Sequence, residues 1–215
     1  INKVVQTLLG SGTKDGLTRG IKILDFSNIP SDMIPVIIGA NGRFLFQVQF
    51  WNTPEKRQPI TLVCDEAHLY LPPFENCNEA QRNTVFQFGR IAKEGRKYGV
   101  TLAVMTQRPS DVNPAILSQA GNIMTLRLTN VVDQEIAKKL MPDGMTGLIE
   151  ELPLLGIGEI IVIGDSVQLP LKIKVAPATL NPTSATMDFC DEWAGHYHPE
   201  DHLNDGVENM RKQKR

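Results

Sequence analysis

The sequence predicts an α/β fold, with a mainly parallel sheet, flanking helices and a late β-hairpin. Short β-branched apolar runs alternate along the chain with longer segments of helical periodicity, a pattern typical of parallel sheets covered by helices. A turn signal, Gly164-Asp165-Ser166, separates two further strand-like runs and predicts the hairpin. With 215 residues, of which 41% are hydrophobic and 21% charged, the chain is long enough for one core.

The central part of the chain divides into four predicted strands and two predicted helices. The strands are 21–26, 60–64, 101–105 and 123–128. The helices are 33–51 and 79–97, and the first has Ser31 as its expected N-cap and Pro35 in its first turn. The two strands of the hairpin are 159–163 and 167–175, and a last helix is predicted over 184–193.

Composition divides the chain into three predicted parts. Residues 1–20 form a flexible lead-in, 21–195 form the folded domain, and 196–215 form a polar tail that ends in a basic run. The chain begins with Ile1 rather than methionine, and from this we expect it to be a piece of a longer protein.

Charge and cysteine content bound the classes of partner and compartment. A formal net charge of -2 argues against a surface devoted to nucleic acid, although a ring motor can hold a DNA strand with a few basic loop residues. The three cysteines, Cys64, Cys77 and Cys190, form no C-x-x-C pair, so a disulfide framework or zinc site is not indicated. We expect a cytoplasmic protein, because the chain has no signal peptide pattern and no apolar run long enough to cross a membrane.

Two carboxylates follow the apolar run Ile60-Thr61-Leu62-Val63-Cys64, at the point where the predicted strand ends. Placing Asp65 and Glu66 there costs several kcal/mol unless a cation compensates them, and a magnesium-bound nucleotide would do so. Asp65 would then hold Mg²⁺, and Glu66 would orient the water that attacks the γ-phosphate of ATP. The alternative is a strand that simply ends in a charged turn.

The next predicted strand, 101–105, also ends in polar residues, Thr106-Gln107-Arg108-Pro109-Ser110. At its end Gln107 could hydrogen-bond both the γ-phosphate and the attacking water. The alternative for this segment is an ordinary strand-ending turn, in which Pro109 blocks further pairing.

Further motifs surround these residues. They are Ile23-Leu24-Asp25-Phe26-Ser27, Leu62 to Pro72, Gly95-Arg96-Lys97-Tyr98-Gly99-Val100, Thr106 to Ser110, Leu152 to Glu159, and Ser184-Ala185-Thr186. Together they resemble the C-terminal half of a HerA-type ATPase, in the HerA and FtsK group of hexameric P-loop DNA motors. The resemblance implies that 21–195 are the C-terminal part of a RecA-like ATPase domain that uses ATP and Mg²⁺.

The resemblance also implies roles for individual residues. Asp65 and Glu66 match the Walker B pair, and Gln107 matches the polar sensor of the following strand. Arg96 matches the arginine finger, which reaches the nucleotide of a neighbouring subunit, where a permanently charged guanidinium suits the transferring phosphoryl group. The alternative for Arg96 is a solvated basic helix end, which also includes Lys93 and Lys97.

One expected motif is missing from the 215 residues. No segment fits G-x-x-x-x-G-K-[ST], the loop whose amides and lysine hold the phosphates, and the glycine-rich stretch 10–16 lacks both the spacing and a preceding strand. In the family this loop lies upstream of the matched region. We therefore expect this chain alone to bind ATP weakly or not at all.

Three functions remain open at this point. The first is an ATP-driven translocase or helicase subunit that acts on double-stranded DNA within a homohexamer, with a nuclease partner. The second is a ring ATPase that scaffolds and gates an effector, a nuclease or NADase, in bacterial anti-phage defence. The third is an α/β interaction domain without turnover, which would need neither the carboxylate pair nor Gln107 and Arg96. A DEAH-helicase interpretation of Asp65-Glu66-Ala67-His68 is disfavoured by the spacing of the later motifs.

Overall fold

A computed structural model describes Leu8 and residues 20–141, 146–179, 189–194 and 199–212. The chain forms two compact units, Ile1–Val175 and Ala176–Arg215. The predicted lead-in therefore lies almost entirely outside the described residues.

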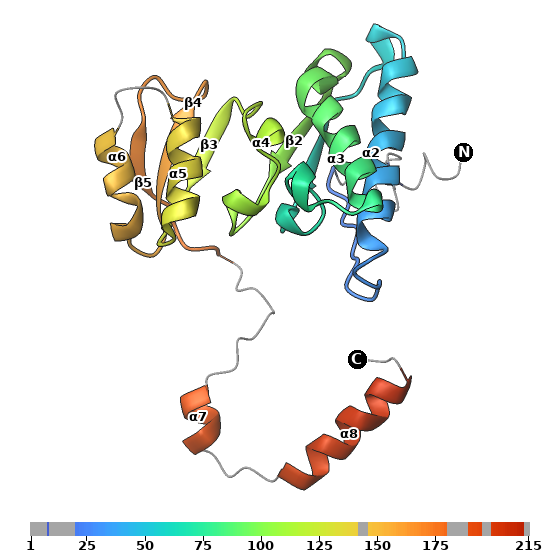
Figure 1. Cartoon of the computed structure of the whole chain (residues 1–215), viewed down its shortest axis with the longest axis vertical. Helices are drawn as coiled ribbons and strands as arrows, with labels where there is room; N and C mark the ends of the chain where they lie inside the picture. The colour runs from blue at the N-terminus through green and yellow to red at the C-terminus, as the bar shows by residue number, and fades with distance from the viewer. Residues whose placement is uncertain (1–7, 9–19, 142–145, 180–188, 195–198, 213–215) are drawn as a thin grey trace. The chain divides into compact units, whose positions relative to one another are not determined.

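The first unit contains a two-stranded parallel sheet with helices on one face (Figure 1). Strand β1 (Ile60–Cys64) pairs with β2 (Val100–Val104) from Ile60 opposite Val100 to Cys64 opposite Val104. Helices α2 (Ile34–Trp51) and α3 (Glu79–Glu94) follow the predicted segments closely, and α3 continues as a 3-10 turn, η4 (Gly95–Tyr98). A capping box between Asn78 and Gln81 starts α3.

Close contact between α2 and α3 depends on two glycines. A Cβ atom at Gly39 would lie 2.4 Å from Oγ1 of Thr84, and one at Gly42 would lie 2.8 Å from the ring of Phe88. The Thr84 hydroxyl in turn donates a 2.6 Å hydrogen bond to the carbonyl oxygen of Pro35 on α2. The two helices therefore pack through their backbones at this crossing.

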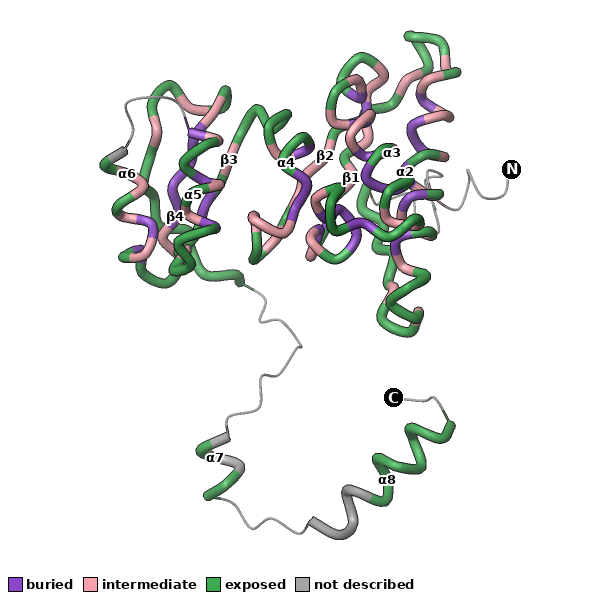
Figure 2. The backbone as a smooth tube through the Cα atoms, in the orientation of Figure 1, coloured by how far each residue is buried: buried purple, intermediate pink, exposed green. Residues whose placement is uncertain are grey.

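The helices and strands share an apolar core, and all buried residues of the chain are drawn in purple in Figure 2. One cluster is built from Cys64, Ala67, Tyr70, Leu71, Cys77, Val85, Phe88, Val112 and Ile116, and a second from Phe46, Ile91 and Val100. Leu62, Leu102 and Val104 pack against these clusters, so alternate side chains of both strands face α2 and α3.

The opposite face of this parallel sheet is open to solvent in the described structure. Thr61 and Thr101 are exposed there, and Val63 is 63% exposed. Strands of parallel sheets are normally covered on both faces. The described residues thus build one half of the expected layer arrangement.

A second, antiparallel sheet has the strand order β3-β4-β5. Strand β3 (Asn122–Thr125) follows the short helix α4 (Pro114–Leu117), and β4 (Glu159–Gly164) pairs with β5 (Leu171–Lys174) to form the predicted hairpin. Helices α5 (Val131–Leu140) and α6 (Thr146–Glu150) lie between β3 and β4 in sequence. A further cluster of buried apolar side chains in this part of the chain includes Leu152, Leu155 and Ile161. The predicted α/β class is confirmed, with one parallel and one antiparallel sheet.

Two local predictions are wrong. Residues 21–26 form no strand: Ile21 is 83% and Ile23 86% exposed, and no described strand pairs with them, so a ladder could not form. Ser31 does not cap α2, because the helix begins only at Ile34, with Met33 as N-cap and Pro35 in its first turn.

The second unit contains α7 (Phe189–Ala194) and α8 (Pro199–Lys212). Helix α7 overlaps the end of the predicted helix 184–193, of which residues 184–188 lie outside the described part. No helix within the described ranges is long and apolar enough to span a membrane. Cys64 and Cys77 are buried free thiols, and Cys190 is exposed.

Candidate active site

The site is built on a sharp turn that follows β1. The strand ladder continues past both strands, since the Met105 amide donates to the Cys64 carbonyl at 2.9 Å and the Ala67 amide donates to the Met105 carbonyl at 3.0 Å. Between these bonds Glu66 adopts a left-handed backbone with φ 46° and ψ 45°, the only non-glycine residue with positive φ in the described ranges. The turn therefore holds the residues after β1 against the end of β2.

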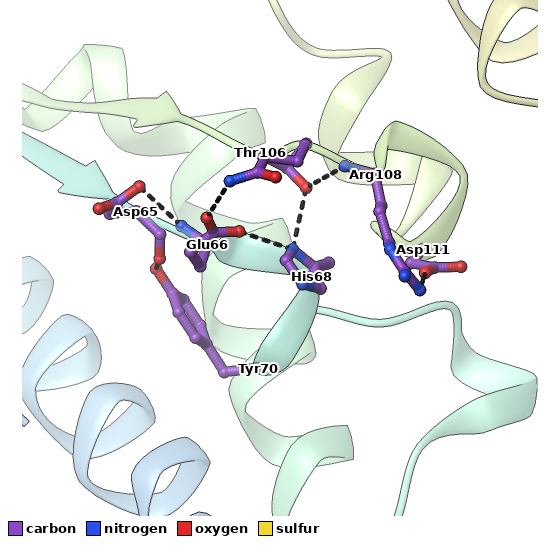
Figure 3. A network of polar contacts seen from close by, with 8 residues as sticks. Asp65, Glu66, His68, Tyr70, Thr106, Arg108 and Asp111 are labelled. Carbon is purple, nitrogen blue, oxygen red and sulfur yellow. Dashed lines mark hydrogen bonds and ion pairs between the residues drawn. The ribbon is translucent and has the colours of Figure 1, made fainter. Parts of the chain in front are cut away.

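Asp65 lies at the carboxyl end of β1 with an exposed side chain. Its Oδ1 accepts a 2.9 Å hydrogen bond from the amide of Glu66, and its carbonyl oxygen accepts one of 2.9 Å from the hydroxyl of Tyr70 (Figure 3). Tyr70 is buried in the core, and this burial raises the pKa of its hydroxyl. The hydrogen bond from Tyr70 thus fixes the backbone of Asp65, while the Asp65 carboxylate stays accessible to solvent.

Glu66 and Gln107, which the sequence places 41 residues apart, are in contact. The Gln107 side-chain amide donates a 2.9 Å hydrogen bond to Oε1 of Glu66. The contact forms because β1 and β2 are parallel neighbours, so their carboxyl ends reach the same edge of the sheet. The Glu66 side chain is 38% exposed and remains open to a ligand.

Two further residues, His68 and Thr106, complete a polar network with Glu66 (Figure 3). His68 Nδ1 lies 3.3 Å from Oε2 of Glu66 and 3.1 Å from Oγ1 of Thr106, and that hydroxyl accepts a 3.0 Å hydrogen bond from the amide of Arg108. Neither His68 nor Thr106 is among the site residues that the sequence predicts. Their positions directly beside Glu66 and Gln107, at the ends of the two strands, are the signal that could have identified them.

Arg96 is not brought to this site. It lies on η4, just before β2, and therefore at the amino end of the sheet, whereas Asp65 and Glu66 follow the carboxyl end of β1. A five-residue strand separates these two edges by about 13 Å. Arg96 is exposed, and no ion pair among the described residues involves it. Within this chain, Arg96 and the pair Asp65 and Glu66 thus lie at opposite edges of the sheet.

The 3-10 turn that carries Arg96 is firmly supported. The Tyr98 ring packs at 4.9 Å from that of Phe50 and edge-on at 5.6 Å to that of Phe46. The guanidinium of Arg57 lies 5.0 Å from the Tyr98 ring centre and donates to the Lys97 carbonyl at 3.2 Å. Arg96 is therefore presented outward from a rigid base.

The donor set at this edge fits a magnesium-bound nucleotide rather than a protein-only metal cage. The described residues contain no cluster of three or more histidine, cysteine or carboxylate side chains. Mg²⁺ in nucleotide sites is held by one or two carboxylates, with phosphate oxygens and water completing the octahedron. One exposed carboxylate at a strand end, that of Asp65, meets this requirement.

The structure resembles VirB4 of Thermoanaerobacter pseudethanolicus with a TM-score of 0.53 and 18% sequence identity, over 72% of this chain and 40% of that one. No protein-family model matches the chain.

The sequence relatives include several HerA proteins. The chain is 38% identical over 122 residues to the DNA double-strand break repair helicase HerA of Pyrococcus furiosus, which covers 57% of this chain and 21% of that protein. It is 29% identical over 177 residues to HerA of Sulfolobus acidocaldarius, covering 80% of this chain and 35% of that protein. The resemblance to HerA-type ATPases is confirmed, and the chain spans only a minor part of these relatives' length.

Proposed function

We propose that this chain is part of an ATP-hydrolysing, HerA-like ring motor, and that Asp65, Glu66 and Gln107 form one side of its nucleotide site. The hydrogen bond from Gln107 to Glu66, 2.9 Å long, is the observation that carries the proposal. It joins a candidate water-activating carboxylate to a candidate phosphate sensor across two neighbouring strands. A solvated turn after each strand would not require such a contact.

The geometry supports a division of labour within the site. Glu66 accepts a hydrogen bond from the attacking water and takes its proton as the new bond to the γ-phosphorus forms and the bond to ADP breaks. Gln107 can exchange its hydrogen bond with Glu66 for one to the γ-phosphate, and so couples nucleotide state to the position of Glu66. Asp65 holds Mg²⁺, which would neutralise charge on the phosphates.

The remaining parts of the site come from outside this arrangement. Arg96 acts in trans on a neighbouring subunit's nucleotide, because its own sheet separates it from Glu66. A phosphate-binding loop comes from a segment beyond these 215 residues, none of which matches the required motif. The proposed ring therefore has composite sites at its subunit interfaces.

DNA is the proposed substrate of the motor. The relatives are named as DNA double-strand break repair helicases, which supports a translocase or helicase rather than an ATPase that only gates an effector protein. An effector such as a nuclease is a compatible further partner. Both roles would use the same site, and they differ in whether DNA stimulates hydrolysis.

The proposal is tested with Glu66→Gln in the protein extended to include the phosphate-binding loop. We expect the variant to bind ATP and magnesium with unchanged affinity and to lose at least about 100-fold in kcat, because the amide cannot take the proton. Glu75→Gln, an exposed glutamate on the nearby turn η3 (Phe74–Asn76), is the matched control and should keep full turnover.

Two results would contradict the proposal. Full hydrolysis by Glu66→Gln would remove Glu66 from its role as the water-activating residue. Wild-type turnover that double-stranded DNA leaves unchanged, but that an effector protein requires, would replace the motor by the gating function.

A further inference from the structure

We propose that His68, supported by Thr106, is a positioning residue for Glu66, which it holds in the orientation needed to activate water. This inference rests on the proposed function of Glu66. Gln107 binds Oε1 of Glu66, and His68 lies beside the other oxygen, Oε2. The two carboxylate oxygens of Glu66 therefore contact side chains from different segments of the chain.

The contacts of His68 favour a hydrogen on Nδ1. A carboxylate only accepts hydrogen bonds, so the 3.3 Å approach of Glu66 Oε2 to Nδ1 of His68 is favourable when that nitrogen carries a hydrogen. Thr106 Oγ1 is the hydrogen-bond partner of that nitrogen, at 3.1 Å, and also accepts a hydrogen bond from the amide of Arg108.

The backbone gives this network its precision. His68 belongs to the 3-10 turn η2 (Ala67–Leu69), which is tied to β2 by the bond between the Ala67 amide and the Met105 carbonyl. Its side chain is only 19% exposed, half the exposure of Glu66. Thr106 follows Met105 directly. The two partners of His68, Glu66 and Thr106, therefore lie just after the ends of β1 and β2.

Among the described residues, Gln107 is the other side chain that holds the Glu66 carboxylate. A glutamate side chain loses about 1.5 kcal/mol of rotamer freedom when it is fixed. Gln107 alone must also exchange its bond when a γ-phosphate arrives. His68 can keep Oε2 in place during that exchange, which leaves Oε1 free to meet the water.

The test compares His68→Ala, His68→Asn and Thr106→Val in the protein extended to include the phosphate-binding loop. We expect His68→Ala to lower kcat for ATP hydrolysis by about 10-fold to 100-fold, as happens when residues that orient a functional group are removed, with KM within about twofold of wild type. His68→Asn retains an N–H donor near the position of Nδ1 and should recover most of kcat. Thr106→Val should show a smaller loss of the same kind.

A purely structural role for His68 gives a different pattern. It predicts a lowered unfolding temperature for both His68 variants and an unchanged kcat per folded molecule, and this result would overturn the inference. So would a kcat of His68→Asn as low as that of His68→Ala at equal unfolding temperature.

The dependence on Glu66 has its own control. In a Glu66→Gln background, His68→Ala should cause no further loss, because it acts through the carboxylate. An added loss of the full size would overturn the inference while leaving the role of Glu66 intact. Normal hydrolysis by Glu66→Gln alone would instead reject the proposed function, so the two failures are distinguishable.

Discussion

The backbone of Glu66, at φ 46° and ψ 45°, occupies a region that costs a residue with a Cβ atom about 1–2 kcal/mol. The turn is retained by bonds on both sides of Glu66, from the Met105 amide to Cys64 and from the Ala67 amide to Met105. Its effect is to turn the Glu66 side chain toward the end of β2. Backbone strain is thus concentrated at the residue to which the proposal assigns water activation.

Cys64 offers a prediction at the same scale. Burial raises the pKa of its thiol from 9.0 to about 11. Between these values the unfolded chain releases a proton that the folded chain retains, so stability is full below pH 9 and falls as the pH rises toward 11. At about one pKa unit above the unfolded value, we expect a loss of about 1 kcal/mol in the free energy of unfolding.

This loss is measured by urea unfolding at pH 8 and pH 10. Cys64→Ala is the control, and its free energy of unfolding, although lower overall, should fall less between the two pH values than that of the wild type. An equal fall in both proteins would show that other groups cause the pH dependence.

At the scale of elements, the α2–α3 crossing decides how the helices lie on β1 and β2. Gly39→Ala would place its Cβ within 2.4 Å of the Thr84 hydroxyl, which is itself bonded to Pro35. We expect this substitution to destabilise the protein by about 1–3 kcal/mol through overpacking.

Gly89→Ala is the matched control for this prediction. Gly89 lies within α3, and a Cβ there would meet no atom within 4 Å, so the same substitution should stabilise the protein by about 0.5–1 kcal/mol through helix propensity. Thermal unfolding of both variants provides the measurement. Equal shifts in the same direction would mean that the helix crossing tolerates the extra methyl group.

On the scale of the whole molecule, the open face of the parallel sheet and the remote position of Arg96 have the same implication. Val63 and Thr101 are exposed on a face that parallel sheets normally cover, and Arg96 is exposed on a rigid turn at the opposite edge of the sheet from Asp65. Both features fit the ring with composite sites that we propose.

Complementation between subunits tests this arrangement. Arg96→Ala should bind ATP normally but lose turnover, whereas Lys97→Ala, its exposed neighbour on η4, should remain active. Mixing Arg96→Ala with Glu66→Gln subunits creates interfaces in which both groups are intact, about a quarter of the total in a randomly mixed head-to-tail ring. ATPase activity of the mixture should therefore rise above that of either variant. Without any rise, Arg96 would not act in trans.

The sequence by itself determined the α/β class, the limits of β1 to the residue, and the identity of Asp65, Glu66 and Gln107 as candidates. These features can be predicted from local sequence, because an apolar run that ends in carboxylates predicts both a strand and the residue at which it ends. The wrong prediction of a strand over 21–26 has a physical reason. The segment has the composition of a strand, but a strand also requires a neighbouring strand with which to form hydrogen bonds.

Only the tertiary structure decided which of these residues meet. The parallel pairing of β1 and β2 brought Gln107 to Glu66, added His68 and Thr106 to the same network, and placed Arg96 at the opposite edge. Sequence patterns encode which residues follow a strand, whereas hydrogen bonds across tens of residues depend on strand order and register. Those are set by the packing of α2 and α3 on the sheet.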